Sequence, residues 1–285
     1  MIFDSESVFE ENVITVLKQH GWKDGVLRYP TERDLLDNWK GILYRNNNDI
    51  DRLGKYPLTD GEMTQIIEQI ETLRTPLALN SFVNGRTVSI TRDNKEDVAH
   101  FGKEVSLYIY DRKEIAGGKS TYQIAQQPVY PAKNKMLNSR RGDLVLLING
   151  MPLIHIELKR SGIPVSQATN QIEKYAHEGV FTGLFRLVQI FVAMNPDDAV
   201  YFANPGVDKF NPSYYFHWAD YNNEPICGGQ NPGKDEWKLF IGGTSGPFPW
   251  RTSSSASTPS LIQRMDALRC CVVISTSRQT PSLMW

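Results

Sequence analysis

RRGDLVLLINGMPLIHIELKRSGIPVSQATNQIEKY, residues Arg140–Tyr175, is the stretch that decides the predicted fold. It contains two short apolar runs, Leu144–Ile148 and Leu153–Leu158, which are separated by Asn149-Gly150. This dipeptide between two such runs indicates a β-hairpin. A helix is predicted to follow, from about Ser166 to Glu178. The stretch therefore predicts a strand–turn–strand–helix unit.

Three charged residues stand inside this apolar frame: Asp143, Glu157 and Lys159. Charges rarely enter a protein core without a partner or a function. Because side chains alternate along a strand, Glu157 and Lys159 share one face with His155. Two carboxylates with main-chain carbonyls and water are ligands that Mg²⁺ takes, and a nearby lysine can hold the attacking water or stabilise charge on phosphorus. The residues fit metal-assisted phosphodiester hydrolysis, with His155 as a hydrogen-bonded neighbour of the site.

The position of Asp143 depends on the geometry of the hairpin. A two-residue loop at Asn149-Gly150 in a regular hairpin would place Asp143 on the face of Ile156, away from Glu157. The two carboxylates meet only if the loop has an odd number of residues, such as Asn149–Met151, or if a bulge lies near Asp143. We therefore predict one of these irregularities.

The pairing of Asp143 with Glu157-Leu158-Lys159 resembles the PD-(D/E)xK nuclease superfamily. The helix sequence Gln171-Ile172-Glu173-Lys174-Tyr175 resembles the QxxxY motif of the nuclease domain in type I restriction enzyme motor subunits. D…ExK alone is a weak pattern, and the hairpin context and the QxxxY helix make it specific. The resemblance extends from Phe9-Glu10-Glu11 to Tyr201–Asn204, so it covers roughly residues 1–225.

The resemblance implies an α/β fold with a central mixed sheet of about five strands, flanked by helices at Ser7–Gln19 and Ser166–Glu178. A helical insertion is expected at about residues 32–75, where apolar residues recur at helical spacing. Short alternating strands are expected between Arg86 and Gln127. The nuclease domain would thus span residues 1–225, followed by a linker and an atypical tail at 226–285.

The resemblance also implies the roles of individual residues. Asp143 and Glu157 would bind Mg²⁺, and Lys159 would position or activate water for the hydrolysis of double-stranded DNA. The helix residues Gln167, Gln171 and Tyr175 would order the site or contact DNA. At the level of the system, the implied partners are DNA and the methylation and specificity subunits of a restriction–modification complex. ATP is expected only in the intact family subunit, because this chain has no GxxxxGK[ST] motif.

Glu10 has two interpretations. Ser7-Val8-Phe9-Glu10 has the pattern of a capping box that opens a helix, and Glu10 would then close this box. Alternatively, because Glu10 lies at the edge of the apolar stripe that contains Phe9 and Val13, it is a further acid of the metal site, as the resemblance implies. The sequence leaves both open.

The charge of the chain is distributed unevenly. The formal net charge is −1, yet basic residues gather around the two site acids: Lys133, Lys135, Arg140, Arg141, Lys159 and Arg160. Such a cluster suits a cleft that a phosphate backbone approaches; the alternative is a solvated loop. With 40% hydrophobic and 22% charged residues, the composition is that of an ordinary globular protein. No signal peptide or membrane-length apolar run is evident, so the cytoplasm is the expected location.

The tail has a different composition from the rest of the chain. From Ile241 to Trp285 it holds a single acid, Asp266, among many Ser, Thr, Pro and Gly residues, which predicts disorder. Because the family chain continues into a motor, we expect a truncated member whose last part is out of frame or unrelated. An intact in-frame gene with a true stop after Trp285, found by resequencing, would contradict the frameshift.

Two other functions stay open. The first is a repair-type or RNA-directed nuclease with the same metal site, which cleavage tests on duplex DNA, single strands and RNA would distinguish. The second is a non-catalytic fragment that docks to partner subunits through Glu32–Leu73. An intact metal-site geometry without cleavage would favour the second.

Overall fold

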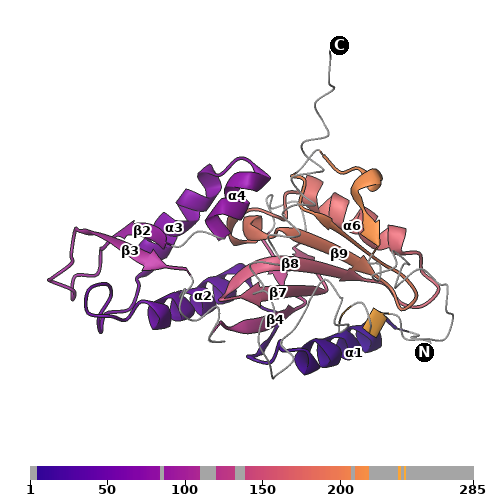
Figure 1. Cartoon of the computed structure of the whole chain (residues 1–285), viewed down its shortest axis with the longest axis horizontal. Coiled ribbons are helices and arrows are strands. Elements are labelled where there is room, and N and C mark those ends of the chain that lie inside the picture. Colours follow the sequence, from indigo (N-terminus) through magenta and orange to yellow (C-terminus); the bar gives the residue numbers. More distant parts are fainter. Residues whose placement is uncertain are drawn as a thin grey trace, which may run out of the picture.

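The hairpin predicted around Asn149-Gly150 is the centre of a mixed β-sheet in the computed structural model, which describes residues 5–83, 87–109, 120–131, 139–206, 209–217, 237–238 and 241. Seven described strands form the sheet in the order β1-β4-β7-β8-β9-β10-β11 (Figure 1). Their bounds are β1 (Val26–Arg28), β4 (Tyr122–Gln126), β7 (Leu144–Ile148), β8 (Met151–Leu158), β9 (Ile190–Met194), β10 (Ala199–Ala203) and β11 (Phe216–His217). The sheet is larger than the five strands expected, because the short strands β1 and β11 extend its two edges.

The hairpin between β7 and β8 contains the predicted irregularity. Ile148 pairs with Met151, so the loop is the two residues Asn149 and Gly150. Both have positive φ, of 50° and 84°, which is typical of a type I′ turn. The register then shifts between Leu146, which pairs with Ile154, and Leu147, which pairs with Pro152. This bulge adds one residue to β8, and the pairing of Leu144 with Ile156 consequently sets Asp143 opposite Glu157.

Two helices cover opposite faces of the sheet, as expected. Helix α6 (Val165–His177) packs Ala168 and Ile172 against Ala193, and Ala193 is the neighbour of Glu157 across the β8–β9 pairing. Helix α1 (Glu6–Gln19) lies on the other face, where the side chain of its Glu10 reaches Gln126. Gln126 pairs with Leu144, and Leu144 pairs with Ile156. Ile156 points away from Glu157, because adjacent side chains on a strand point to opposite faces. Figure 1 shows α1 below the sheet and α6 above it.

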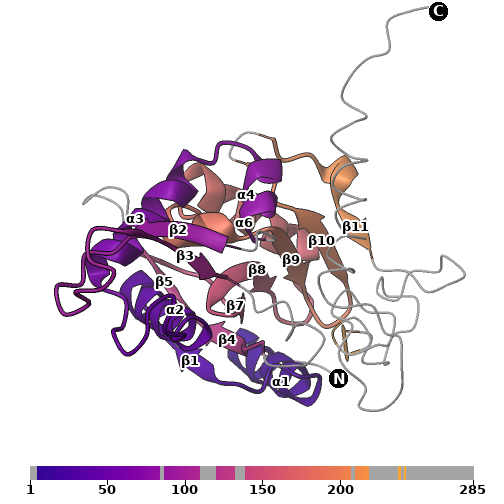
Figure 2. The same ribbon diagram turned by 60° about the vertical axis from the view of Figure 1, so that its left-hand side comes forward.

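The predicted helical insertion contains α2 (Glu32–Asn46) and α3 (Asp60–Thr72). Thr59 and Glu62 form a capping box at the start of α3. Helix α4 (Pro76–Val83) and the antiparallel pair β2 (Thr87–Thr91) and β3 (Glu104–Tyr108) follow. Figures 1 and 2 show α3, β2 and β3 grouped at the end of the molecule away from α1. There Arg92 is buried and paired with Glu62 and Asp97 at 2.7 and 3.0 Å.

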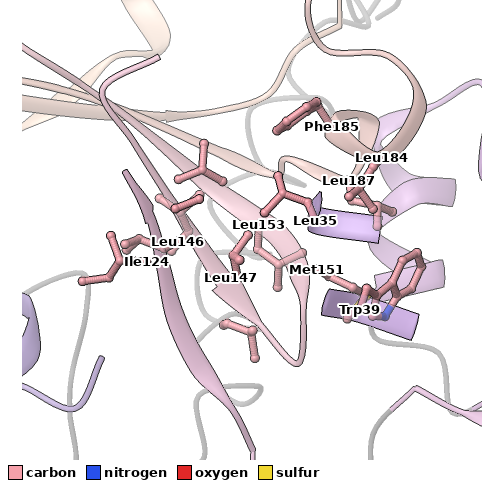
Figure 3. Close-up of a cluster of buried hydrophobic side chains, with 14 of the residues drawn as sticks. Leu35, Trp39, Ile124, Leu146, Leu147, Met151, Leu153, Leu184, Phe185 and Leu187 are labelled. Atoms are coloured by element: carbon pink, nitrogen blue, oxygen red, sulfur yellow. The ribbon is translucent and has the colours of Figure 1, made fainter. Parts of the chain in front are cut away.

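The tip of the central hairpin is held by helix α2. Figure 3 shows Trp39 and Leu35 of this helix beside Met151 and Leu153 of β8. A Cβ on Gly150 would lie 2.8 Å from the Cα of Trp39. Glycine is therefore required at position 150 for two reasons: it adopts the positive φ of the turn, and it leaves room for the backbone of α2.

The remaining described elements are small. They are β5 (Val129–Tyr130), which pairs with β6 (Arg140–Arg141), and the 3₁₀ turns η1 (Gly183–Leu187) and η2 (Pro212–Tyr214). Within the predicted linker Trp237 is buried, and its ring contacts Phe9 at 5.3 Å between centroids; Ile241, the first residue of the predicted tail, is also buried. The predicted tail beyond residue 241 lies outside the described residues. The helices of the described segments include none that is long and apolar enough to cross a membrane.

Candidate active site

Asp143 lies at the start of β7, where the hairpin register directs it toward Glu157. Its backbone carbonyl accepts a hydrogen bond of 2.7 Å from the Gln127 N–H. Its Oδ2 accepts one of 2.6 Å from the backbone N–H of Leu158, across the hairpin. One carboxylate oxygen is therefore fixed against β8, and the whole side chain is held next to the ExK residues.

Glu157 and Lys159 project from the end of β8, as predicted. Glu157 is fully buried, and within the described part of the chain neither of its carboxylate oxygens forms a hydrogen bond. Lys159 Nζ lies 3.8 Å from Glu157 Oε1 and 3.7 Å from Glu6 Oε1, and it donates a hydrogen bond of 2.9 Å to the Leu158 carbonyl. The ammonium group is thus held beside Glu157, within 4 Å of both Glu157 and Glu6.

The two carboxyl groups are electrostatically destabilised as anions. Burial raises the pKa of Glu157 to about 8. Burial and the neighbouring Glu157 raise the pKa of Asp143 well above its usual range. Two buried carboxylates can both ionise only if a cation offsets their charge. The unbonded oxygens of Glu157 fit this need, because buried polar groups without partners are rare.

The described residues offer a carboxylate pair rather than a larger protein cage. Among them, no group of three or more His, Cys, Asp and Glu side chains has the arrangement of a metal site. Mg²⁺ does not require such a group, since it usually keeps several waters and binds through one or two carboxylates. The donor set formed by Asp143 and Glu157 therefore fits Mg²⁺ better than a cation that needs many protein ligands.

Glu10 is buried near this pair but does not close a capping box. The N-cap of α1 is Ser5, whose hydroxyl accepts from the Val8 N–H, so the prediction of a Ser7–Glu10 box is wrong. The Glu10 carboxylate instead accepts hydrogen bonds from Gln126 at 2.6 Å and from Gln127 at 3.3 Å.

Glu10 influences the site through its charge, but among the described residues it does not form a three-ligand cluster with Asp143 and Glu157. It contributes to the raised pKa of Asp143, and burial also raises the pKa of Glu10 itself. Its role as a metal ligand stays a prediction.

The QxxxY residues brace the site. Gln171 Nε2 donates to Tyr175 Oη at 2.7 Å, and the Tyr175 hydroxyl donates to the Arg141 carbonyl at 2.8 Å. Tyr175 is buried, and burial raises its pKa to about 12, so the hydroxyl stays protonated. This geometry favours ordering of the β6 segment before Asp143 over direct contact with DNA. Gln167, one turn earlier on α6, is exposed to solvent.

The predicted basic residues have different surroundings. Arg140 forms two hydrogen bonds of 2.7 Å with the Glu178 carboxylate. Arg141 is exposed, with its guanidinium 5.8 Å from the centroid of the Tyr29 ring, and Arg160 is exposed. Lys133 and Lys135 lie outside the described residues. Arg141 and Arg160 are therefore the described arginines of this cluster that are open to an approaching phosphate.

A buried histidine, His155, and a buried tyrosine, Tyr130, lie beside the carboxylate pair. His155 Nδ1 lies 2.9 Å from Tyr130 Oη, and His155 Nε2 lies 3.3 Å from Glu157 Oε2. Burial lowers the pKa of His155 to about 4, so the ring is neutral at ordinary pH. The sequence placed His155 beside the site, but it gave no signal for Tyr130, because the two-residue strand β5 is too short for a periodic pattern.

Comparisons with known proteins identify the chain's relatives. The model of the family described as type I restriction enzyme R protein N terminus matches residues 4–210. A type I restriction enzyme endonuclease subunit of Staphylococcus saprophyticus is 32% identical over 79% of this chain, and one of Staphylococcus aureus MSSA476 gives the same figures. The Escherichia coli EcoprrI endonuclease subunit is 28% identical over 79% of this chain and 67% of its own length. The chain spans 22% of the length of the two staphylococcal relatives.

Proposed function

Because this chain belongs to the family of type I restriction enzyme R protein N-terminal regions, we propose that it is a Mg²⁺-dependent DNA endonuclease domain of a type I restriction–modification system. The observation that carries the proposal is the carboxylate pair of the half-buried Asp143 and the fully buried Glu157, set opposite each other by the bulge in β8. The relatives that match it are named endonuclease subunits of type I restriction enzymes.

Asp143 and Glu157 would hold the metal. Asp143 Oδ2 is occupied by the Leu158 N–H, which leaves Oδ1 for the cation, and both Glu157 oxygens are without a hydrogen bond in the described residues. When bound, Mg²⁺ would supply Lewis-acid stabilisation of the charge on the scissile phosphate. The cation would also offset the cost of burying the two carboxylates as anions, which raises both pKa values.

Lys159 would act on the reacting groups from the rim of the pair. Its ammonium group lies between Glu157 and Glu6, at 3.8 and 3.7 Å. From there it can donate a hydrogen bond to the attacking water or to a phosphate oxygen, whose charge grows in the transition state. The Gln171–Tyr175 pair would keep the β6 segment in place while DNA binds.

Membership of the family supports a proposal for the partners. We propose that the chain acts on double-stranded DNA together with methylation and specificity subunits, and that ATP serves a motor region. This chain has no GxxxxGK[ST] motif, so ATP hydrolysis would come from elsewhere in the complex. Exposed Arg141 and Arg160 would meet the DNA backbone.

Cleavage of supercoiled plasmid in Mg²⁺ tests the proposal, with wild type compared with Glu157→Gln. The amide has nearly the same shape but carries no charge, so cleavage should fall at least about 100-fold, as for loss of a group that stabilises transition-state charge. Glu173→Gln is the matched control, because Glu173 lies on α6 and is partly exposed in a pair with His177. It should cleave like wild type.

Cleavage assays on duplex DNA, single strands and RNA distinguish the alternative functions. Cleavage of duplex DNA that disappears in Glu157→Gln, with little cleavage of single strands or RNA, is the expected result. Preferential cleavage of RNA would instead assign the site to an RNA-directed nuclease. No cleavage by wild type, even after an intact motor-containing subunit complex is added, would contradict the proposal and favour a docking role.

A further inference from the structure

Two buried polar atoms without hydrogen bonds face each other beside the site. Neither His155 Nε2 nor Glu157 Oε2 has a hydrogen-bond partner among the described residues, yet they lie 3.3 Å apart. Both side chains are fully buried. Leaving such groups unpaired is unfavourable for a neutral group and more so for a charged one. A small rotation of the Glu157 carboxylate would satisfy both atoms.

Tyr130 holds the opposite nitrogen of the ring. Its hydroxyl lies 2.9 Å from His155 Nδ1, and its own ring is packed edge-on against Phe185 with centroids 4.6 Å apart. Tyr130 is fully buried as well. Because the packed ring keeps the hydroxyl away from solvent and beside His155 Nδ1, this contact fixes the orientation of the imidazole.

Gly142 allows this pair to lie directly beside Asp143. A Cβ at position 142 would lie 2.5 Å from Tyr130 Oη and 2.8 Å from His155 Cε1. Neither contact is possible for a real side chain without displacement of the pair. The absence of a side chain immediately before Asp143 thus lets the tyrosine and histidine approach the carboxylates.

The charge of Glu157 determines where the proton on His155 must be. An ionised carboxylate accepts hydrogen bonds only, so a favourable contact requires a proton on His155 Nε2. A neutral ring then has a lone pair on Nδ1, and the Tyr130 hydroxyl is the donor that meets it. Each member of the series thereby has a defined role, with tyrosine as donor to histidine and histidine as donor to glutamate.

We propose that His155, with its tautomer fixed by Tyr130, is a positioning residue that orients the Glu157 carboxylate for a divalent cation. This inference rests on the proposed metal site. It goes beyond that site because it assigns a function to two residues outside the D…ExK and QxxxY patterns. Residues that orient metal ligands typically change metal affinity about 10–100-fold when they are replaced.

Binding of Mn²⁺ to the 285-residue chain, followed by the EPR signal of the free ion, tests the proposal without reliance on cleavage. His155→Leu should raise the Kd at least about 10-fold, because it removes the donor. His155→Gln should recover most of the affinity, since its amide can place an N–H near the Nε2 position. Tyr130→Phe, which keeps the ring, should raise the Kd by a smaller factor.

Phe202→Leu is the matched control, because Phe202 is a buried aromatic residue that packs on Phe191 and Phe210 and, among the described ring contacts, not on Tyr130 or His155; it should leave the Kd unchanged. Glu157→Gln separates the two proposals. If wild type shows no binding that depends on Glu157, the metal site and the positioning role both fail. If wild type binds through Glu157 and both His155→Leu and Tyr130→Phe bind equally well, the positioning role alone fails.

A ¹⁵N spectrum of the histidine-labelled chain saturated with Mg²⁺ gives an independent test. The expected signal for His155 is the tautomer with the proton on Nε2, and this preference should weaken in Tyr130→Phe. A proton on Nδ1 in the Mg²⁺-saturated wild type would overturn the inference.

Discussion

Replacing Glu157 with glutamine should stabilise the metal-free protein, and the gain should grow with pH. Burial raises the pKa of Glu157 from 4.5 to about 8, so the folded chain keeps a proton that the unfolded chain loses. The contribution of Glu157 to stability is therefore fully present below pH 4.5 and is lost as the pH rises toward 8. The difference between the two pKa values corresponds to about 5 kcal/mol at most, since each pKa unit is worth about 1.4 kcal/mol.

Urea unfolding of both proteins without metal, at about pH 5 and about pH 9, measures this effect. Glutamine cannot ionise, so the free energy of unfolding of Glu157→Gln should fall less than that of wild type, by a few kcal/mol. The partly exposed Glu173→Gln should follow the wild-type curve. Parallel wild-type and Glu157→Gln curves would refute the conclusion that Glu157 is buried as a neutral acid. Mg²⁺ should stabilise wild type, by about 2.7 kcal/mol at 100 times its Kd, and leave the variant unchanged.

Three further outcomes are expected. Mg²⁺ binding near pH 7 should release protons, since both site carboxyls have raised pKa values and must ionise to bind; calorimetry in buffers of different ionisation enthalpy counts them, and zero release would contradict those pKa shifts. Arg92→Met should reduce the free energy of unfolding by about 3–5 kcal/mol, because Glu62 loses its buried partner; a change below about 1 kcal/mol in urea unfolding would contradict this. Gly150→Ala should cost about 2–4 kcal/mol through its positive φ and the clash with Trp39, and an unchanged Tm would exclude the close packing of the hairpin tip.

The central hairpin could be predicted because its signals are local. Asn149-Gly150 between two apolar runs specifies a turn with positive φ at both residues. The need for an irregularity also followed from the sequence. Side chains alternate along a strand, so a regular hairpin with a two-residue loop would direct Asp143 and Glu157 to opposite faces. The location of the irregularity did not follow. Every residue of β7 and β8 is buried, so no alternation of polar and apolar residues marks the position where the register shifts.

The candidate site was predictable where its residues lie in one continuous segment. Asp143, Glu157, Gln171 and Tyr175 all belong to the hairpin and the helix that follows it. Tyr130 was missed because it reaches the site through tertiary packing, from a strand of two residues.

The N-cap of α1 was misplaced by two residues because residue type does not distinguish the two candidates. Ser5 and Ser7 are equally good capping residues by type, and in the structure the Ser5 hydroxyl is the one that accepts from the Val8 N–H. The buried position of Glu10 and its bonds to Gln126 and Gln127 likewise come from distant parts of the chain.

The measurement that tests the metal site most directly is anomalous diffraction from crystals soaked in Mn²⁺, an ion that prefers the same oxygen ligands as Mg²⁺. We predict one strong peak bonded to carboxylate oxygens of both Asp143 and Glu157, and no such peak in Glu157→Gln crystals. A well-ordered wild-type site with no peak between the two carboxylates, or the same peak in the variant, would contradict the assignment of this pair as the metal ligands of a nuclease.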